Sequence, residues 1–338
     1  MNESYNEIRK ERISRALELS PYLEGGLYDF DDGLKVLCQK SQRSSLIIDG
    51  LSFHNSNPLT QVSINNDQPK HFYGRIMWFC SSGDIKIFSD DETLIICCSK
   101  SNYLRKINNY DYFSRFFQIP KLIHRDEANN ILIEEFIDFK GKNNQDDDVI
   151  LRTIYEDYTS YFVNINNPST VNYKTMNNLL MVSSRISHLE QFKYIIDLID
   201  PSLFGLEFPF IKLHGDLWTA NLLLEKDNTN NRGLWYIDWD ESGEYIFFFD
   251  FFKFIWNELD VNCNYTYLEK YLKGCFDCNF ENLFKIFQLE FLPEHRKSYL
   301  CMFFLNFILD ETGMMAYKAK HQEIVDFRTK VVPLIQDF

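Results

Sequence analysis

Residues 211–224 read IKLHGDLWTANLLL, a polar loop between two apolar runs. Asp216 and Asn221 stand five positions apart inside the loop. The apolar runs on either side predict two strands, and the loop between them presents a carboxylate and an amide oxygen from one turn. The alternative to a functional loop is a structural turn, in which Asp216 and Asn221 only form hydrogen bonds with nearby backbone groups.

A second motif, LWYIDWD at 234–240, is an apolar strand that ends in Asp238. Phosphoryl transfer needs a carboxylate beside the attacking hydroxyl and oxygen ligands for a metal on the phosphates. Asp216 suits the first role, and Asn221 and Asp238 suit a hard cation such as Mg²⁺. The two motifs together therefore predict a phosphoryl-transfer site.

The string HGDLWTANLL followed by YIDWD resembles the superfamily of aminoglycoside phosphotransferases, choline kinases and fructosamine kinases. Members usually show H-G-D-x-x-x-x-N and then I-D. The resemblance implies that Asp216 is the catalytic base and that Asn221 and Asp238 bind Mg²⁺, with ATP as the phosphoryl donor. It also implies that His214 and Gly215 shape the loop.

The N-terminal half has the element order of a protein-kinase small lobe. Three short strands, a helix and two further strands are expected, at 75–80, 84–88, 93–98, 102–117, 121–124 and 130–136. Before them, 4–19 is expected to be helical and 20–70 irregular or mixed. After them the patterns are mostly helical, at 149–163, 173–186, 187–199, 247–259, 265–275, 281–291, 296–309 and 322–335.

These patterns predict an α+β class and a bilobal protein-kinase-like fold, with a small antiparallel β lobe and a larger, mainly helical lobe. We expect an N-terminal extension at 1–70, a small ATP-binding lobe at 71–138 and a helical catalytic and substrate lobe at 139–338. The resemblance also implies that Asp250 anchors the following helix to the catalytic loop.

The residues that would hold ATP are atypical. A kinase small lobe carries a Lys on its third strand, paired with a Glu on the helix. Here the third strand ends at Cys98, so Lys100 is the nearest candidate and Lys86 is another. The helix at 102–117 contains no Glu. Glu135 lies in the expected link between the lobes, where the resemblance implies that the backbone meets adenine.

The 338 residues carry a net charge of −14, which disfavours binding to nucleic acid or to an anionic membrane. The N-terminus lacks the apolar core of a secretory signal, and the apolar stretch at 299–309 is too short to span a bilayer. Cys275 and Cys278 lack a second pair of zinc ligands nearby. We therefore expect a cytoplasmic protein with reduced cysteines.

The expected function is ATP- and Mg²⁺-dependent transfer of a γ-phosphoryl group to a hydroxyl of a small molecule of sugar, aminoglycoside or amino-alcohol type. The acidic charge favours a cationic acceptor. The alternative is a pseudokinase, a nucleotide-binding or interaction module without turnover. The missing helix Glu favours that alternative, whereas the intact Asp216, Asn221 and Asp238 argue against it.

Overall fold

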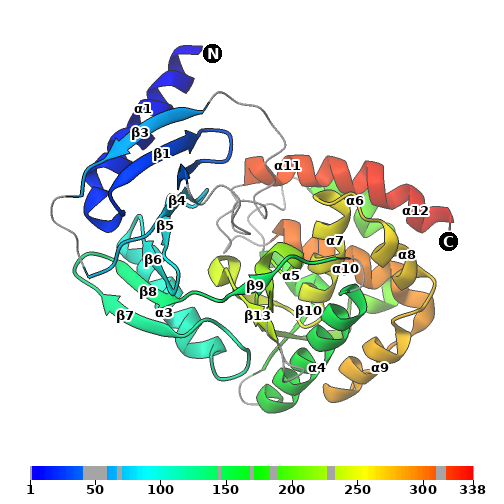
Figure 1. Ribbon diagram of the computed structural model, residues 1–338. Coiled ribbons are helices and arrows are strands. Elements are labelled where there is room, and N and C mark those ends of the chain that lie inside the picture. Colours follow the sequence, from blue (N-terminus) through cyan, green and yellow to red (C-terminus); the bar gives the residue numbers. More distant parts are fainter. Residues whose placement is uncertain are drawn as a thin grey trace. The chain divides into compact units, whose positions relative to one another are not determined.

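The computed structural model describes the chain in the segments 2–40, 59–66, 71–143, 146–167, 171–182, 189–226, 233–309 and 317–337. The chain divides into two units, each described by itself below. The first comprises Met1–Asn144 with Leu223–Ile237, and the second comprises Gln145–Leu222 with Asp238–Phe338. Figure 1 shows the first unit as mainly strands and the second as mainly helices.

The first unit is built on an eight-stranded sheet in the order β3-β1-β2-β4-β5-β6-β8-β7, in which all neighbours are antiparallel. Consecutive strands of the hairpins lie side by side, as tight turns dictate. The strands are β1 Gly26–Asp31, β2 Val36–Gln39, β3 Thr60–Ile64, β4 Ile76–Phe79, β5 Ile85–Phe88, β6 Glu92–Ile96, β7 Leu122–Asp126 and β8 Ile131–Glu135.

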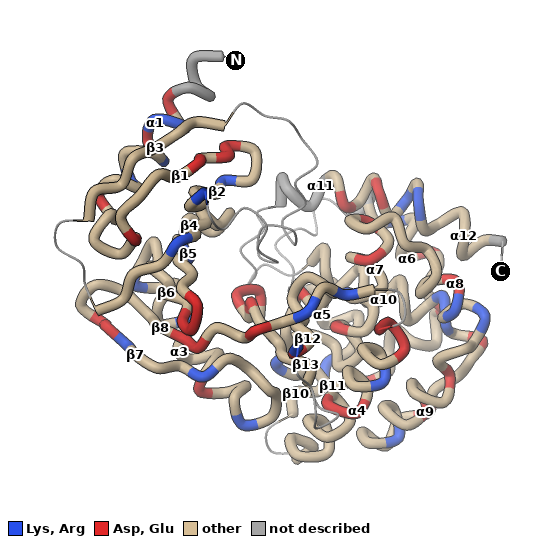
Figure 2. Tube along the Cα trace, in the orientation of Figure 1, with Lys and Arg blue, Asp and Glu red and all other residues tan. Residues whose placement is uncertain are grey.

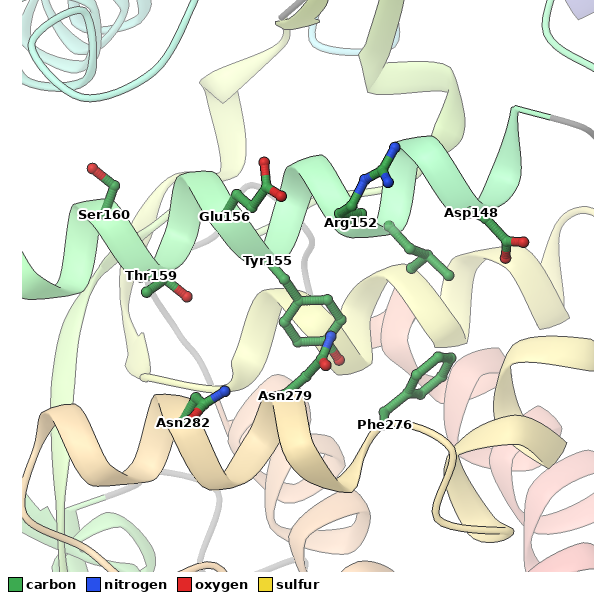
Figure 3. Close-up of a pocket in the computed structure, with 10 residues that line it drawn as sticks. Asp148, Arg152, Tyr155, Glu156, Thr159, Ser160, Phe276, Asn279 and Asn282 are labelled. Carbon is green, nitrogen blue, oxygen red and sulfur yellow. The ribbon is translucent and has the colours of Figure 1, made fainter. Parts of the chain in front are cut away.

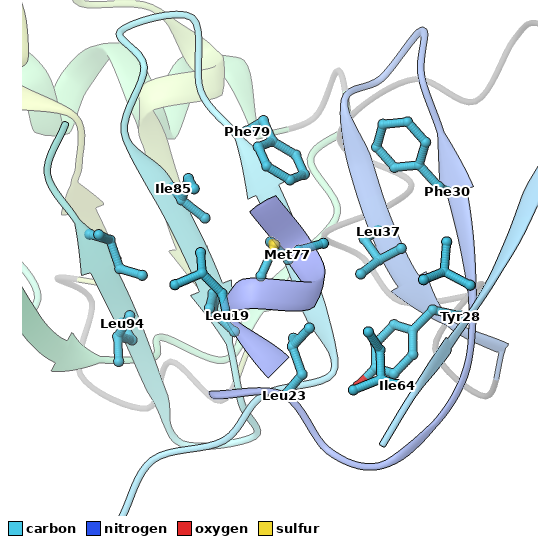
Figure 4. Close-up of a cluster of buried hydrophobic side chains, with 14 of the residues drawn as sticks. Leu19, Leu23, Tyr28, Phe30, Leu37, Ile64, Met77, Phe79, Ile85 and Leu94 are labelled. Atoms are coloured by element: carbon cyan, nitrogen blue, oxygen red, sulfur yellow. The ribbon is translucent and has the colours of Figure 1, made fainter. Parts of the chain in front are cut away.

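One face of this sheet is covered by residues of and just after α1 (Asn2–Glu18). Ala16 and Leu19 pack into a buried cluster with apolar residues of strands β1 to β6 and of β8. Figure 4 shows side chains of this cluster converging between the helix and the strands. The sequence predicted a separate N-terminal extension at 1–70. In the structure, β1, β2 and β3 belong to the same sheet as the later strands.

The other face of the sheet carries α3 (Lys100–Phe113), which begins where Ser99 accepts a hydrogen bond from the backbone N–H of Asn102. Ile95 and Cys97 pack against this helix in a second apolar cluster. Alternation along a strand therefore gives β6 one face toward α1 and the opposite face toward α3.

A small sheet of order β13-β12-β9 completes the first unit's strands. Its members are β9 Phe139–Lys140, β12 Leu222–Glu225 and β13 Leu234–Tyr236. β12 and β13 are neighbours in this sheet and contain the apolar runs of the two sequence motifs. The α+β class and the division into a β-rich and a mainly helical unit are thus confirmed.

The second unit surrounds a three-stranded sheet of order β10-β11-β14 with helices. The strands are β10 Asn172–Thr175, β11 Glu207–Leu213 and β14 Gly243–Ile246. The helices are α4 Asp147–Ile165, α5 Met176–Val182, α6 Leu189–Ile196, α7 Phe249–Asp260, α8 Thr266–Leu272, α9 Asp277–Ile286, α10 Arg296–Leu309, α11 Tyr317–Asp326 and α12 Val332–Asp337, the last two joined by a π-helical turn.

The helix predicted at 173–186 is wrong in its first turn, which is the strand β10. Its residues pair with β11 along the edge of the sheet, so tertiary pairing overrides the helical pattern. The helix begins only after Thr175, whose hydroxyl accepts a hydrogen bond from the backbone N–H of Asn178 at 3.0 Å.

Helix α7 is enclosed on all sides, because every residue from Phe249 to Leu259 is buried. Its aromatic side chains contact rings of neighbouring helices, as in the pairs of Phe249 with Phe303 and of Phe251 with Tyr155. The helix is therefore a fixed platform for the polar groups that it carries.

Within the described residues, no helix combines the length and apolarity that crossing a bilayer requires.

Candidate active site

The loop that carries Asp216 follows the last residue of β11 directly. After Leu213 the chain turns through 214–218, forms the short 3-10 helix Thr219–Asn221 and enters β12. The side-chain amide of Asn221 donates to the backbone oxygen of Asp216 at 2.7 Å and lies 3.3 Å from its Oδ2. The spacing of five that the sequence offers is thus a closed turn, as expected for a rigid loop.

Asp250 anchors this loop from the first turn of α7. Its carboxylate accepts hydrogen bonds from the backbone N–H groups of His214 at 2.8 Å and Gly215 at 2.9 Å, and from the Tyr158 hydroxyl at 2.6 Å. Burial raises the pKa of Asp250, and His214 and the three donors act against that rise. The expected link between Asp250 and the loop is confirmed.

Gly215 is required by a close backbone approach. Its φ is +83°, and a Cβ there would lie 2.1 Å from the carbonyl oxygen of Glu241. The Ser242 hydroxyl donates to the Leu213 carbonyl at 2.7 Å, and Leu213 pairs with Gly243. The loop and the segment that follows Asp238 are therefore fastened together.

Asp238 has a left-handed backbone, with φ 64° and ψ 57°, at the entrance to the 3-10 helix Trp239–Glu241. Asp tolerates this region better than most residues, but it still costs about 1 kcal/mol or more. Conformations of this kind gather at functional sites. The strained backbone turns the chain sharply at the residue that the sequence singled out.

His214 shapes the loop from a fully buried position. Its ring lies 4.4 Å from that of Trp239, centroid to centroid, and its Nδ1 accepts the backbone N–H of Asp216 at 3.3 Å. The imidazole thus supports the backbone of Asp216 from one side and the segment after Asp238 from the other.

Three further polar residues of α7 meet the loop, and sequence reasoning missed them. The Asn257 amide donates to Asp216 Oδ1 at 3.0 Å, and Lys253 Nζ lies 3.4 Å from the same oxygen. Glu258 Oε1 accepts from the hydroxyl and the backbone N–H of Thr219, at 2.5 and 3.2 Å. Oδ1 of Asp216 and the start of the 3-10 helix are therefore both held by α7.

A signal for these residues was present in the sequence. The polar positions Asp250, Lys253, Asn257 and Glu258 recur at helical spacing in an otherwise mostly aromatic run, FFFDFFKFIWNEL. All four are buried. A polar stripe on a buried helix must face other polar groups, and here those groups belong to the loop.

The donor set fits the metal that the resemblance implies. Asn221 and Asp238 offer amide and carboxylate oxygens, which are the ligands of hard cations. The amide nitrogen of Asn221 is engaged by Asp216, so the oxygen is the atom left to serve a cation. Mg²⁺ commonly takes only one or two protein carboxylates and completes its shell with phosphates and water.

The candidates for holding ATP lie in the first unit. Lys100 opens α3 and pairs with Glu127 at 2.7 Å, with 45% of its side chain exposed. Glu135 ends β8, and its carboxylate accepts the backbone N–H of Lys121 at 2.7 Å. The charge of Lys100 is thus already matched at the surface.

Lys86, the other candidate lysine, lies within strand β5 and not on α3. It lies directly across from Ile95 of β6 in the sheet register, and Ile95 packs against α3. Cross-strand partners share a face, so Lys86 is on the α3 face of the sheet. Its ammonium lies 5.9 Å from the centre of the Trp78 ring.

An ion pair joins the sheet to α3 with its charges reversed relative to a kinase small lobe. Lys106 of the helix lies 3.3 Å from the carboxylate of Asp84, whose side chain is only 1% exposed. Burial opposes the charge, but the hydrogen bond from the Cys98 backbone N–H and the Lys106 ammonium outweigh it and lower the pKa of Asp84. The acid therefore stands on the strand side and the cation on the helix.

Charged residues are interspersed along both units, and Figure 2 shows acidic and basic positions mixed over their helices and strands. A hollow of about 660 Å³ lies between α4 and α9, with Tyr155, Phe276 and Asn279 facing it (Figure 3). Its charged lining residues Asp148, Arg152 and Glu156 are exposed. None of its lining residues belongs to the loop, and we assign it no role in the chemistry.

No family model matches the sequence, and no curated protein matches it. Solved structures do match. An ethanolamine kinase of Plasmodium vivax is 12% identical with a TM-score of 0.44, covering 77% of this chain and 82% of its own. An amicoumacin kinase with AMP-PNP and Ca²⁺ is 13% identical with a TM-score of 0.43, covering 75% and 87%.

A point mutant of an aminoglycoside 2′-phosphotransferase IIIa, in its GDP complex, is 13% identical with a TM-score of 0.42, covering 75% of this chain and 88% of its own. The names of these three proteins describe kinases or phosphotransferases that act on small molecules. At this level of similarity the function has to be argued from the residues of this chain.

Proposed function

We propose that the protein is an ATP- and Mg²⁺-dependent phosphotransferase that moves the γ-phosphoryl group to a hydroxyl of a small molecule. One observation carries the proposal: the Asp216 carboxylate is fixed by Asn221, Lys253 and Asn257, yet 34% of its side chain is exposed. A carboxylate that is both held in place and reachable is what a positioned base requires.

In the proposed reaction, the acceptor hydroxyl donates a hydrogen bond to Asp216. Its oxygen bonds to the γ-phosphorus as the bond from that phosphorus to the β–γ bridging oxygen breaks, and ADP leaves. The hydroxyl proton passes to Asp216. A bound Mg²⁺ would neutralise phosphate charge, and Asn221 and Asp238 would hold it. Catalysis here rests on positioning and electrostatics, so replacing Asp216, Asn221 or Asp238 should lower the rate of transfer strongly.

For the nucleotide we propose Lys86 as the phosphate-binding cation ahead of Lys100. Lys86 shares a sheet face with Ile95 of β6. Ile95 lies in the part of the third strand where a kinase would carry its lysine. Lys100 is paired with Glu127 at the surface. The role of Glu135 beside adenine stays a prediction from the resemblance.

The acceptor class is proposed as sugar, aminoglycoside or amino-alcohol, with the net charge of −14 favouring a cationic member. A panel of ethanolamine, choline, kanamycin and glucose therefore comes first. ADP release from Mg-ATP with each compound tests the proposal. Release that depends on one acceptor supports it, and release with none of a broad set of hydroxyl compounds contradicts it.

A nucleotide-binding module without turnover is the second candidate. It is favoured by Ile95 and Cys97, the apolar residues that face α3 where a kinase strand would carry its lysine. Thermal unfolding with and without Mg-ATP, on wild type and Asp238→Asn, separates the cases when combined with the panel. Saturation at a hundredfold excess over Kd stabilises by about 2.7 kcal/mol. A shift without turnover favours the module.

A further inference from the structure

Lys253 is a lysine in an unusual place. Its side chain is 6% exposed on the buried helix α7, and its ammonium lies 4.5 Å from the centre of the Phe307 ring. Lysines are almost never buried unless their charge is matched. Here the matching groups are Asp216 Oδ1 at 3.4 Å and Asn257 Oδ1 at 3.0 Å.

Asn257 closes the arrangement. One helical turn after Lys253, its amide oxygen accepts from the ammonium while its amide nitrogen donates to Asp216 Oδ1 at 3.0 Å. Both groups therefore converge on the same carboxylate oxygen. The second oxygen, Oδ2, is on the side of Asn221.

We propose that Lys253, together with Asn257, is a positioning residue for the base. The pair fixes Oδ1 of Asp216, so that Oδ2 is the oxygen presented to the acceptor hydroxyl. No bond to Lys253 forms or breaks in the reaction. This inference rests on the proposed phosphotransfer and adds to it the residues that aim the base.

A purely structural role is the competing explanation, in which Lys253 merely ties α7 to the loop. That tie already exists without it. Asp250 holds the backbone of His214 and Gly215, and Glu258 holds Thr219. Removing the ammonium should therefore leave the loop anchored and affect the orientation of one side chain, so the loss should fall on kcat and not on nucleotide binding.

The test uses the full chain and Mg-ATP with water as acceptor, a probe that needs no identified substrate. Lys253→Met should lower kcat for ADP release about 10- to 100-fold with the KM for Mg-ATP unchanged, as expected for a misplaced catalytic group. Lys253→Arg should recover part of the rate because it retains a cation. Lys270→Met, on the exposed surface of α8, should match wild type.

A second readout is a thermal double-mutant cycle of Lys253→Met with Asp216→Asn. The Tm loss from Lys253→Met should be smaller when Asp216 is already replaced. Additive Tm losses, or a Lys253→Met variant with wild-type kcat, overturn the inference. So does an equal loss of rate in Lys253→Arg and Lys253→Met.

Failure of the underlying function looks different. Wild type that binds Mg-ATP but releases no ADP, with water or with any acceptor of the panel, contradicts the phosphotransfer proposal. If the double-mutant cycle still shows coupling in that case, the contact between Lys253 and Asp216 is only structural. The positioning role of Lys253 is then overturned.

Discussion

The carboxylate of Asp250 accepts the backbone N–H of Gly215 at 2.9 Å, which joins a buried helix to the turn that presents Asp216. The same helix reaches Asp216 itself through Asn257. The loop that carries Asp216 is therefore fixed by helix α7 on one side. It lies on a rigid platform, which is how a site keeps its groups within the small tolerance that catalysis demands.

Replacing Asp250 should destabilise the second unit. Hydrogen bonds to a charged group are worth about 1.5–3 kcal/mol each, and Asp250 accepts three. Asp250→Ala should therefore lower the free energy of unfolding by at least about 3 kcal/mol, and Tyr158→Phe, which removes one donor, by less. Denaturant unfolding measures both. Equal stability of Asp250→Ala and the surface control Asp197→Ala would refute the anchoring role.

Gly215→Ala should disrupt the loop. The added methyl would meet the Glu241 carbonyl oxygen at 2.1 Å, and φ is +83°, so both sterics and backbone oppose it. Gly205→Ala is the matched control, because a Cβ there has no heavy atom within 4 Å. We expect a clear drop in Tm and in ADP release for the first and little change for the second. Similar behaviour of the two variants would count against the close approach.

Asp84 should make stability depend on pH in the acid range. Burial opposes its charge, but Cys98 and Lys106 hold its folded pKa below the usual 3.8. A lowered folded pKa contributes stability that is present above pH 3.8 and is lost as the pH falls through the folded value. Tm followed from neutral to acid pH should show wild type well above Asp84→Asn, with the gap closing below about pH 3.8.

The control for that comparison is Asp138→Asn, an exposed carboxylate of the same unit. It should follow wild type at every pH. A gap between wild type and Asp84→Asn that widens on acidification would contradict the assigned direction.

Lys86 and Lys100 should differ in nucleotide binding. Lys86→Met should weaken Mg-ATP binding about tenfold or more, because charge-assisted contacts to phosphate are strong. Lys100→Met should leave binding near wild type, since Lys100 pairs with Glu127 at the surface. Titration calorimetry with Mg-ATP measures both. The reverse order of losses would return the role to Lys100.

Much of the fold and of the loop was predictable from the sequence, because local pattern and motif spacing agree. The strands from β4 to β8 and helix α3 lie within a few residues of their predicted positions. The link from Asp250 to the loop followed from the resemblance. The positions of these strands and of α3 depend on residues close in sequence, where periodicity and turn residues act directly.

The rest depends on tertiary contacts. The place of β1 to β3 in the sheet needs pairing between distant strands, which short irregular segments do not reveal. The contacts of Lys253 and Asn257 with Asp216 join residues about forty positions apart. Only the polar stripe on an aromatic helix hinted at them.

The central claim, that Asp216 is the base of a phosphotransferase, is tested most directly by the rate of ADP release at saturating Mg-ATP and acceptor. Wild type should turn over, and Asp216→Asn, with an unchanged fold and an unchanged Mg-ATP thermal shift, should be slower by about 10²- to 10⁴-fold, the usual contribution of a general base. Equal rates in the two proteins would contradict the account.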